Sequence, residues 1–208
     1  DNIRQEIVKT NDAQKYGELM KQLKERDGSV LIFVKTKFGA ERLAAKLNKE
    51  NQSADAIHGD LRQSRREKVI TGFRQRKFRV LVATDIAARG LDIPHIESVI
   101  NYDLPQCPED YIHRIGRTGR AGRNGLAISL VNHAEHFNVR KIERFTKQTI
   151  PVEVVAGHEP TRRAPSNAGR PSGKPNARPG WKQGHGAGNG EGRGKAYAGK
   201  AKHDGYAR

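Results

Sequence analysis

The chain has 208 residues, enough for one ordinary domain with an extension. Its formal net charge of +16 favours a polyanionic partner such as nucleic acid. The sequence contains no run of 18 apolar residues and no charged-then-apolar leader, so we expect neither a membrane span nor a secretion signal. Cys107 is the single cysteine, which excludes a cysteine-based metal cluster and favours a reducing, cytoplasmic location.

The composition changes near Gly157. Residues 157–208 contain no Leu, Ile, Val, Phe or Met, and they hold twelve glycines, five prolines and eleven Lys or Arg against three acidic residues. Such a segment buries too little apolar surface to offset the entropy lost on ordering. We therefore predict a folded domain over residues 1–156 and a disordered basic tail over residues 157–208.

The folded part alternates helical and β-rich patterns. Apolar residues at helical spacing begin with Tyr16, Leu19, Met20 and Leu23, a helix that Asn11 or Asp12 would cap. Further helices are predicted over residues 38–50, 62–76 and 108–115. Asn132 and Glu135 form a plausible capping box for a last helix, which we expect to extend through Phe145. Strands are predicted over residues 29–34, 54–57, 80–83, 98–101 and 127–131.

Repeated β-α-β units of this size predict an α/β fold with a parallel, twisted sheet sandwiched between helices. Ligands of such sheets bind outside the carboxyl ends of the strands. The polar segments that leave these ends are residues 35–37, 58–60, 84–92 and the stretch from Asp103 onward. We expect the functional residues there.

Four consecutive Arg-x-Gly triplets run from Arg114 to Gly125. Arginine offers a fixed fork of donors that matches phosphate oxygens, and glycine lets the backbone approach a ligand closely. The triplets follow a predicted helix that begins at Pro108 and carries an apolar stripe of Tyr111, Ile112 and Ile115. A docked helix would fix the arginines in space, which favours polyphosphate binding over a solvated basic loop.

A second polar segment, residues 83–93, directly follows a predicted strand. Its carboxylates, Asp85 and Asp92, could hold a metal, bond a ribose hydroxyl or cap a turn. The residues of this segment alone do not decide among these roles.

Read together, five segments resemble the second RecA-like lobe of DEAD-box RNA helicases. They are residues 31–37 (Leu-Ile-Phe-Val-Lys-Thr-Lys), 58–66, 83–93, 99–105 and 113–120 (His-Arg-Ile-Gly-Arg-Thr-Gly-Arg), in the family's order and spacing. The resemblance covers about residues 1–156. It implies a RecA-like sheet and part of an ATP-dependent RNA helicase, which separates short duplexes with little sequence preference.

The resemblance also implies roles for individual residues. Those that match contacts to the sugar-phosphate backbone of single-stranded RNA are Thr36, Gln63, Arg66 and Thr84. Asp92 matches the carboxylate that bonds the ATP ribose, and Arg117 and Arg120 match the finger arginines that reach the γ-phosphate. Arg89 and His113 match residues that touch the other lobe. Arg114 and Arg123 could equally be surface or structural residues.

The 208 residues contain no G-x-x-x-x-G-K-[ST] loop and no Asp-Glu-Ala-Asp. We therefore expect no metal site in this chain, with ATP shared between two lobes and Mg²⁺ held by the N-terminal RecA-like lobe of a parent protein. By itself the chain should not hydrolyse ATP.

The predicted tail carries Trp181, Tyr197 and Tyr206 among its basic residues. Stacking on aromatic rings together with phosphate attraction would bind RNA without sequence preference, whereas the alternative is a solubilising tail. Two other functions compete with the RNA helicase. One is a non-catalytic RNA-binding or assembly module, which would not need Arg117 and Arg120, and the other is a DNA-directed helicase.

Overall fold

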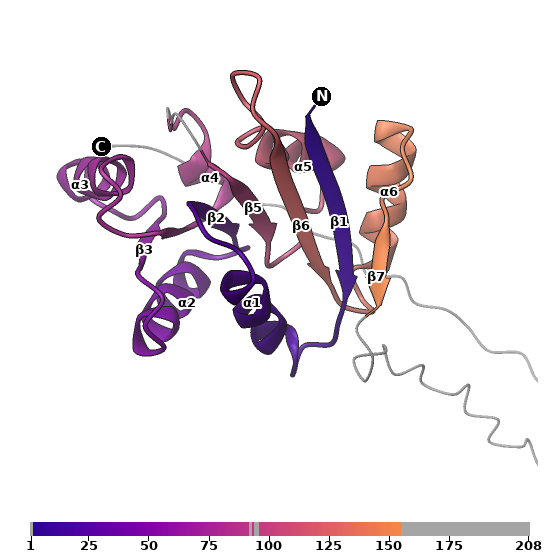
Figure 1. The fold of residues 1–208 in the computed structure, drawn as a ribbon, viewed down its shortest axis with the longest axis horizontal. Helices are drawn as coiled ribbons and strands as arrows, with labels where there is room; N and C mark the ends of the chain where they lie inside the picture. The colour runs from indigo at the N-terminus through magenta and orange to yellow at the C-terminus, as the bar shows by residue number, and fades with distance from the viewer. Residues whose placement is uncertain (1, 92, 94–95, 155–208) are drawn as a thin grey trace, which may run out of the picture. The chain divides into compact units, whose positions relative to one another are not determined.

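In the computed structural model, the described residues are 2–91, 93 and 96–154, so Asp92 and the predicted tail lie outside them. The described part contains a seven-stranded parallel sheet in the order β3-β4-β2-β5-β6-β1-β7 (Figure 1). The strands are β1 (Ile3–Lys9), β2 (Val30–Phe33), β3 (Ala54–Ile57), β4 (Val80–Ala83), β5 (Ser98–Asn101), β6 (Gly125–Val131) and β7 (Val152–Val154). The predicted parallel α/β sheet is confirmed.

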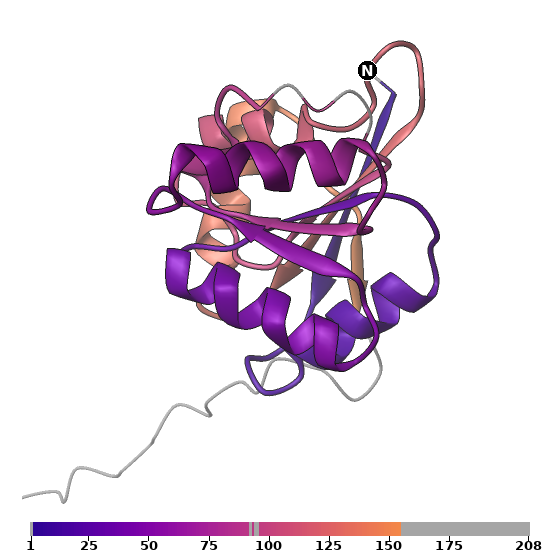
Figure 2. The same cartoon turned by 90° about the vertical axis from the view of Figure 1, so that its left-hand side faces the viewer.

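Helices cover both faces of the sheet. One face carries α1 (Lys15–Lys24) and α2 (Lys37–Lys49). The other carries α3 (Gln63–Arg74), α4 (Asp85–Ala88), α5 (Pro108–Ile115) and α6 (His136–Thr146). Figure 2 shows the arrangement from the side of β3, with α3 above the sheet and α2 below it.

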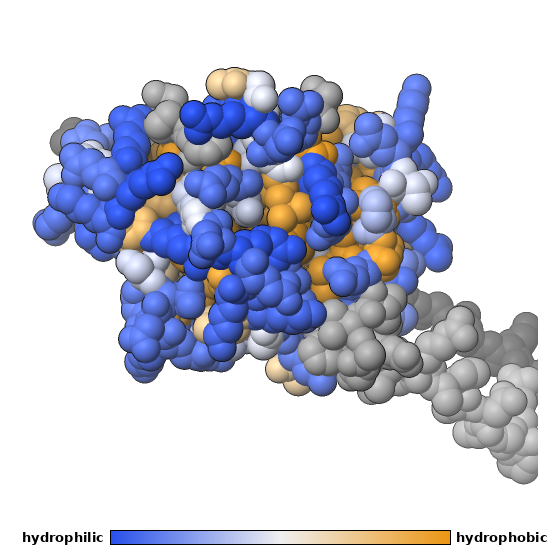
Figure 3. Space-filling view, viewed as in Figure 1, coloured by the Kyte–Doolittle hydropathy of each residue, from blue (hydrophilic) through white to orange (hydrophobic). Residues whose placement is uncertain are grey.

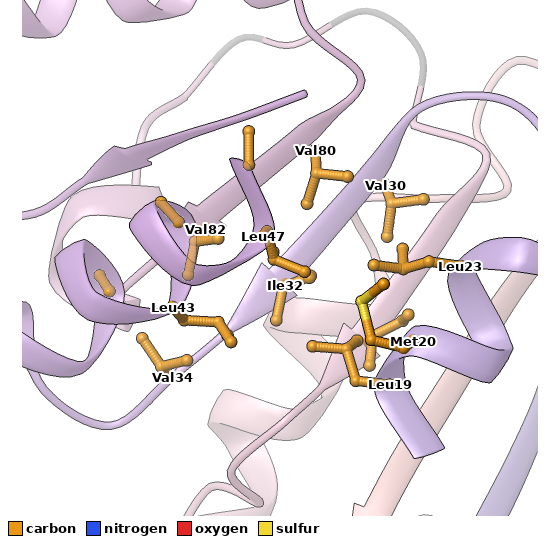
Figure 4. Close-up of a cluster of buried hydrophobic side chains, with 14 of the residues drawn as sticks. Leu19, Met20, Leu23, Val30, Ile32, Val34, Leu43, Leu47, Val80 and Val82 are labelled. Atoms are coloured by element: carbon orange, nitrogen blue, oxygen red, sulfur yellow. The ribbon is translucent and has the colours of Figure 1, made fainter. Parts of the chain in front are cut away.

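The central strand β2 explains why its sequence reads as one continuous apolar run. Val30 and Ile32 pack toward α1 and α2, whereas Leu31 and Phe33 pack toward α3 and α4. Figure 4 shows the first of these layers, in which Leu19 and Leu23 of α1 meet β2. Burying such a side chain contributes roughly 1.5–3 kcal/mol. Outside the core, polar side chains cover most of the face in Figure 3.

Two of the predicted caps are formed. The side chain of Asn11 accepts a hydrogen bond from the backbone N–H of Gln14 at 3.0 Å, in the turn that leads into α1. Asn132 and Glu135 make the predicted reciprocal box ahead of α6, with distances of 2.9 Å and 3.1 Å. Both sets of bonds lie in the turns that lead into the helices, and the residues directly before the first helical residues, Gln14 and Glu135, form no further side-chain cap.

Three elements were not predicted from the sequence, namely β1, β7 and α4. β1 reads Ile-Arg-Gln-Glu-Ile-Val-Lys and buries only Ile7 and Val8 completely, so its pattern is too polar to stand out. β7 has three residues, and α4 has four. All three are stabilised by their neighbours rather than by a local pattern.

The strand register brings the carboxyl ends of the central strands level. Phe33 of β2 lies beside Ala83 of β4 and Asn101 of β5, and Ala83 lies beside Ile57 of β3. The segments that follow these residues therefore emerge along one edge of the sheet, which we call the carboxyl edge. The loops that start there contain residues 34–36 after β2, residues 58–60 after β3 and residue 84 after β4.

Candidate functional site

The helix α5 presents the first residues of the arginine series. Its first turn contains Pro108, Glu109 and Asp110. The two carboxylates are stabilised there by the positive end of the helix dipole. Tyr111 and Ile115 are buried as predicted, but Ile112 is 39% exposed. The predicted stripe was wrong at Ile112, because adjacent residues of a helix point in different directions and Tyr111 takes the inward one.

Arg114 is buried, with 2% of its surface exposed. Its guanidinium donates to both carboxylate oxygens of Asp85 at 2.6 Å and 2.7 Å. It also donates to Asn101 Oδ1 at 3.1 Å and to the carbonyl of Asp103 at 2.6 Å, and it lies over the ring of Phe33. Of the two roles left open by the sequence, Arg114 has the structural one, and Asp85 is its partner.

The loop after α5 is anchored between its arginines. Thr118 is buried, and its hydroxyl lies 2.6 Å from the carbonyl oxygen of Ile96 and 2.9 Å from that of Glu97. Gly119 has a φ of +67°, and a Cβ there would lie 2.6 Å from Ile3. Gly125 allows an equally close approach, because its Cβ would lie 2.4 Å from the backbone nitrogen of Gly119. The glycines of the triplets thus shape this loop.

Arg117 and Arg120 lie on either side of Thr118. Arg117 is partly buried and donates to the carbonyl of Leu91 at 3.1 Å. Burial, together with the positive charge of Arg120, lowers the pKa of Arg117 from its usual value. Arg120 is exposed, and its Nε donates to the carbonyl of Gly116 at 2.7 Å, which leaves its terminal nitrogens for other partners. Two neighbouring cations, one of them desolvated, favour an anionic ligand.

A shallow hollow between α4 and α5 brings three of the predicted residues together. Its lining residues are Phe33, Asp85, Ala88, Arg89, Asp110, His113, Arg114 and Arg117. Arg89 and His113, the predicted interlobe residues, therefore share one surface with Arg117, and Arg89 donates to Asp110 at 3.0 Å. Arg120 does not line the hollow, and Asp92 lies outside the described residues.

The predicted RNA contacts gather at the carboxyl edge. Thr36 is exposed at the start of α2, where its hydroxyl accepts the N–H of Gly39 at 3.0 Å. Gln63 begins α3 and donates to Glu67, and Arg66 donates to the carbonyl of Ala87 at 2.7 Å. Thr84 directly precedes α4 and is only 8% exposed.

The arginine loop does not lie at this edge. Thr118 pairs with Ile96 just before β5, and Gly125 donates to Asn2 at the start of β1 and β6. Arg117 and Arg120 are therefore carried by a loop whose backbone meets the sheet at the amino ends of the strands. The loop backbone reaches the amino ends because the chain between β5 and β6 runs back along the sheet, but the Arg117 side chain still lines the hollow that contains Phe33 and Asp85. Arg114 and Asp85 connect the two regions.

Comparison with known proteins decides the family. Residues 14–122 match the family described as Helicase conserved C-terminal domain. The chain belongs to this family.

Curated relatives are RNA helicases, several of them named as DEAD-box proteins. A probable ATP-dependent RNA helicase of Methanocaldococcus jannaschii is 49% identical over 149 residues, which are 72% of this chain and 41% of that protein. The DEAD-box ATP-dependent RNA helicase CshA of Bacillus anthracis is 42% identical over 148 residues, 71% of this chain and 28% of that protein. The chain thus spans less than half the length of these relatives.

Solved structures agree with the sequence relatives. A DEAD-box protein of Methanococcus jannaschii matches with a TM-score of 0.70 and 48% identity over 73% of this chain and 42% of that one. The C-terminal domain of the DEAD-box protein Dbp5 matches with a TM-score of 0.68 and 38% identity over 74% of this chain and 91% of that one. The described residues have the RecA-like fold of DEAD-box C-terminal domains.

The helicase C-terminal domain also contains a buried ionic group that the sequence did not predict. Lys15 lies 3.2 Å from Glu135 and 3.6 Å from Asp103, and Asp103 accepts the backbone N–H of Lys35 at 2.9 Å. This group fixes the backbone next to Thr36. The capping box predicted Glu135 at a helix start, but no sequence signal links it to Lys15.

The described residues hold no group of three or more His, Cys, Asp or Glu side chains placed to bind a metal ion. Within the same part of the chain, every helix is too short or too polar to cross a bilayer.

Proposed function

We propose that this helicase C-terminal domain is the second lobe of an ATP-dependent RNA helicase. In this proposal it completes an ATP site with Arg117 and Arg120 and binds the backbone of single-stranded RNA. The observation that carries the proposal is the anchoring of two adjacent guanidiniums on one loop. The buried hydroxyl of Thr118 ties that loop to the residues before β5.

On the ATP side, the domain contributes positive charge. Phosphoryl transfer spreads negative charge over the γ-phosphate, and arginines placed against it typically accelerate transfer by about 10³ to 10⁵. Repulsion between Arg117 and Arg120, together with burial of Arg117, favours an anion between them. Asp92 would bond the ribose. In this proposal the Mg²⁺ that accompanies ATP is held by the N-terminal lobe.

On the RNA side, the four residues of the carboxyl edge would contact sugar and phosphate. Thr36 and Gln63 are exposed there, and Arg66 and Thr84 flank α4. Backbone contacts position a strand without reading its bases, so binding should tolerate any sequence. A Dbp5 structure bound to RNA and ADP BeF3 shares this fold with a TM-score of 0.69 and 39% identity, which supports the assignment.

Closure of the two lobes would join these activities. Arg89 and His113 line the same hollow as Arg117, so a lobe docking there would touch all three. The buried pair of Arg114 and Asp85 connects this hollow with Thr84, which precedes Asp85 at the start of α4. RNA bound at the carboxyl edge would thereby favour the closed, hydrolysing state and local strand separation. The proposal also places the protein in the cytoplasm, with its tail as a second RNA-binding segment.

The proposal is tested by ATP turnover with and without single-stranded RNA. Residues 1–208 alone should show no RNA-stimulated turnover, whereas a longer protein that includes an N-terminal lobe should show it. Turnover by the isolated chain would contradict the division of the ATP site between two lobes. A two-lobed protein that binds RNA without any ATPase would favour the non-catalytic module.

A further inference from the structure

Phe38 is an exposed aromatic residue beside the carboxyl edge. It lies in the first turn of α2, two residues after Thr36, and 65% of its surface is exposed. Exposed apolar residues are common on protein surfaces and need no explanation by themselves. The surroundings of Phe38 distinguish it from such a residue.

One face of the Phe38 ring is already stacked. The guanidinium carbon of Arg42, one turn further along α2, lies 5.5 Å from the ring centroid. This contact orients the ring and keeps a positive charge next to it. Among the described residues the ring has no other aromatic or cationic partner, so its second face is available for stacking.

Cations surround the platform formed by Phe38 and Arg42. Lys35 and Lys37 are exposed on either side of Thr36. Asp60 pairs with Lys37, so these two charges offset each other, and Oε1 of Glu41 lies 2.7 Å from Nε2 of His58. Lys35 and Arg42 carry the positive charge that remains beside the ring. Beyond Arg42 a groove of about 250 Å³ opens between α1 and α2, lined in part by Arg42, Lys46 and Tyr16. The electrostatics here suit a polyanion that also has flat rings.

We propose that Phe38, held by Arg42, is a stacking platform for a base of the RNA strand next to the phosphate contacted by Thr36. The inference rests on the proposed RNA contact at Thr36 and extends it from the backbone to the bases. Stacking on an aromatic face accepts every base, so the platform adds affinity and position without sequence preference. Arg42 would contribute charge toward the adjoining phosphate.

The chain offers a matched control. Phe137 at the start of α6 is also 65% exposed, and Lys141 lies 4.7 Å from its ring centroid. The two rings share residue type, exposure and a cation one turn away. No predicted RNA contact lies on α6, which packs on the opposite face of the sheet from α2. Phe38 differs from Phe137 in its position beside Thr36 and in having an arginine rather than a lysine against its ring.

The test measures binding of the full chain to a short single-stranded RNA and to an abasic strand of the same length, by fluorescence anisotropy. Phe38→Ala should weaken binding to the base-bearing RNA by about 5- to 150-fold and leave binding to the abasic strand unchanged. Phe38→Trp should retain binding, and Phe137→Ala should match wild type. Because stacking releases no counterions, Phe38→Ala should not change the salt dependence.

Unchanged RNA binding by Phe38→Ala would overturn the platform, as would an equal loss with Phe137→Ala or an equal loss on the abasic strand. A loss of binding to an N-terminal lobe without a loss of RNA would instead assign Phe38 to a protein contact. Thr36→Asp keeps the helix cap but opposes a phosphate, so it should weaken binding to both strands. No effect of Thr36→Asp would count against the backbone contact rather than against stacking.

Discussion

Replacing Arg114 by Met should destabilise the domain strongly. Arg114 is 2% exposed and satisfies three acceptors, namely Asp85, Asn101 and the carbonyl of Asp103. Removing one partner of a buried ion pair costs about 3–5 kcal/mol, because the remaining charge stays without compensation. The Asp85 side chain is 29% exposed, so water can reach part of it, and we expect a loss of about 3 kcal/mol.

Urea unfolding followed by circular dichroism measures this loss. The transition midpoint should fall while its slope stays unchanged, because the same surface is exposed on unfolding. Arg123→Met is the matched control, since Arg123 belongs to the same series but is exposed, and it should change stability by no more than about 0.5 kcal/mol. A loss below about 1 kcal/mol for Arg114→Met, or equal losses for both variants, would refute the structural role of Arg114.

Three further predictions concern the loop and the tail. Thr118→Val should cost about 1–3 kcal/mol in urea unfolding, because it removes the hydroxyl donor of the Ile96 carbonyl, and unchanged stability would contradict the anchor. Gly119→Ala should cost about 1–3 kcal/mol, since its Cβ would collide with Ile3. Deleting residues 157–208, with eleven basic against three acidic residues, should weaken RNA binding and flatten its salt dependence without lowering the melting temperature. A lower melting temperature would mean that the tail docks.

The sequence predicted the sheet because its central strands are buried on both faces and read as apolar runs bounded by polar segments. It also predicted the capping box, because Asn132 and Glu135 lie three residues apart in the sequence and the motif depends only on this local spacing. It missed β1 because this strand has few apolar residues and is stabilised by pairing with β6, which is distant in the sequence.

Prediction of the site was uneven for a physical reason. Residue type indicated that Arg114, Arg117 and Arg120 could bind anions, but burial depends on where α5 packs. Only the folded chain shows that Arg114 is buried in an ion pair with Asp85, whereas Arg120 remains exposed. The position of the loop backbone at the amino ends likewise follows from the path of the chain between β5 and β6, which a strand-end rule does not include.

The most direct test of the proposed finger residues is single-turnover ATP hydrolysis by a protein that carries both lobes, in saturating RNA. Arg117→Ala and Arg120→Ala should each lower the hydrolysis rate by about 10³-fold or more, following the magnitude typical of arginine fingers. Both variants should bind RNA without nucleotide as wild type does, because neither residue is among the predicted RNA contacts. Hydrolysis within about threefold of wild type by either variant would contradict its assignment as a finger.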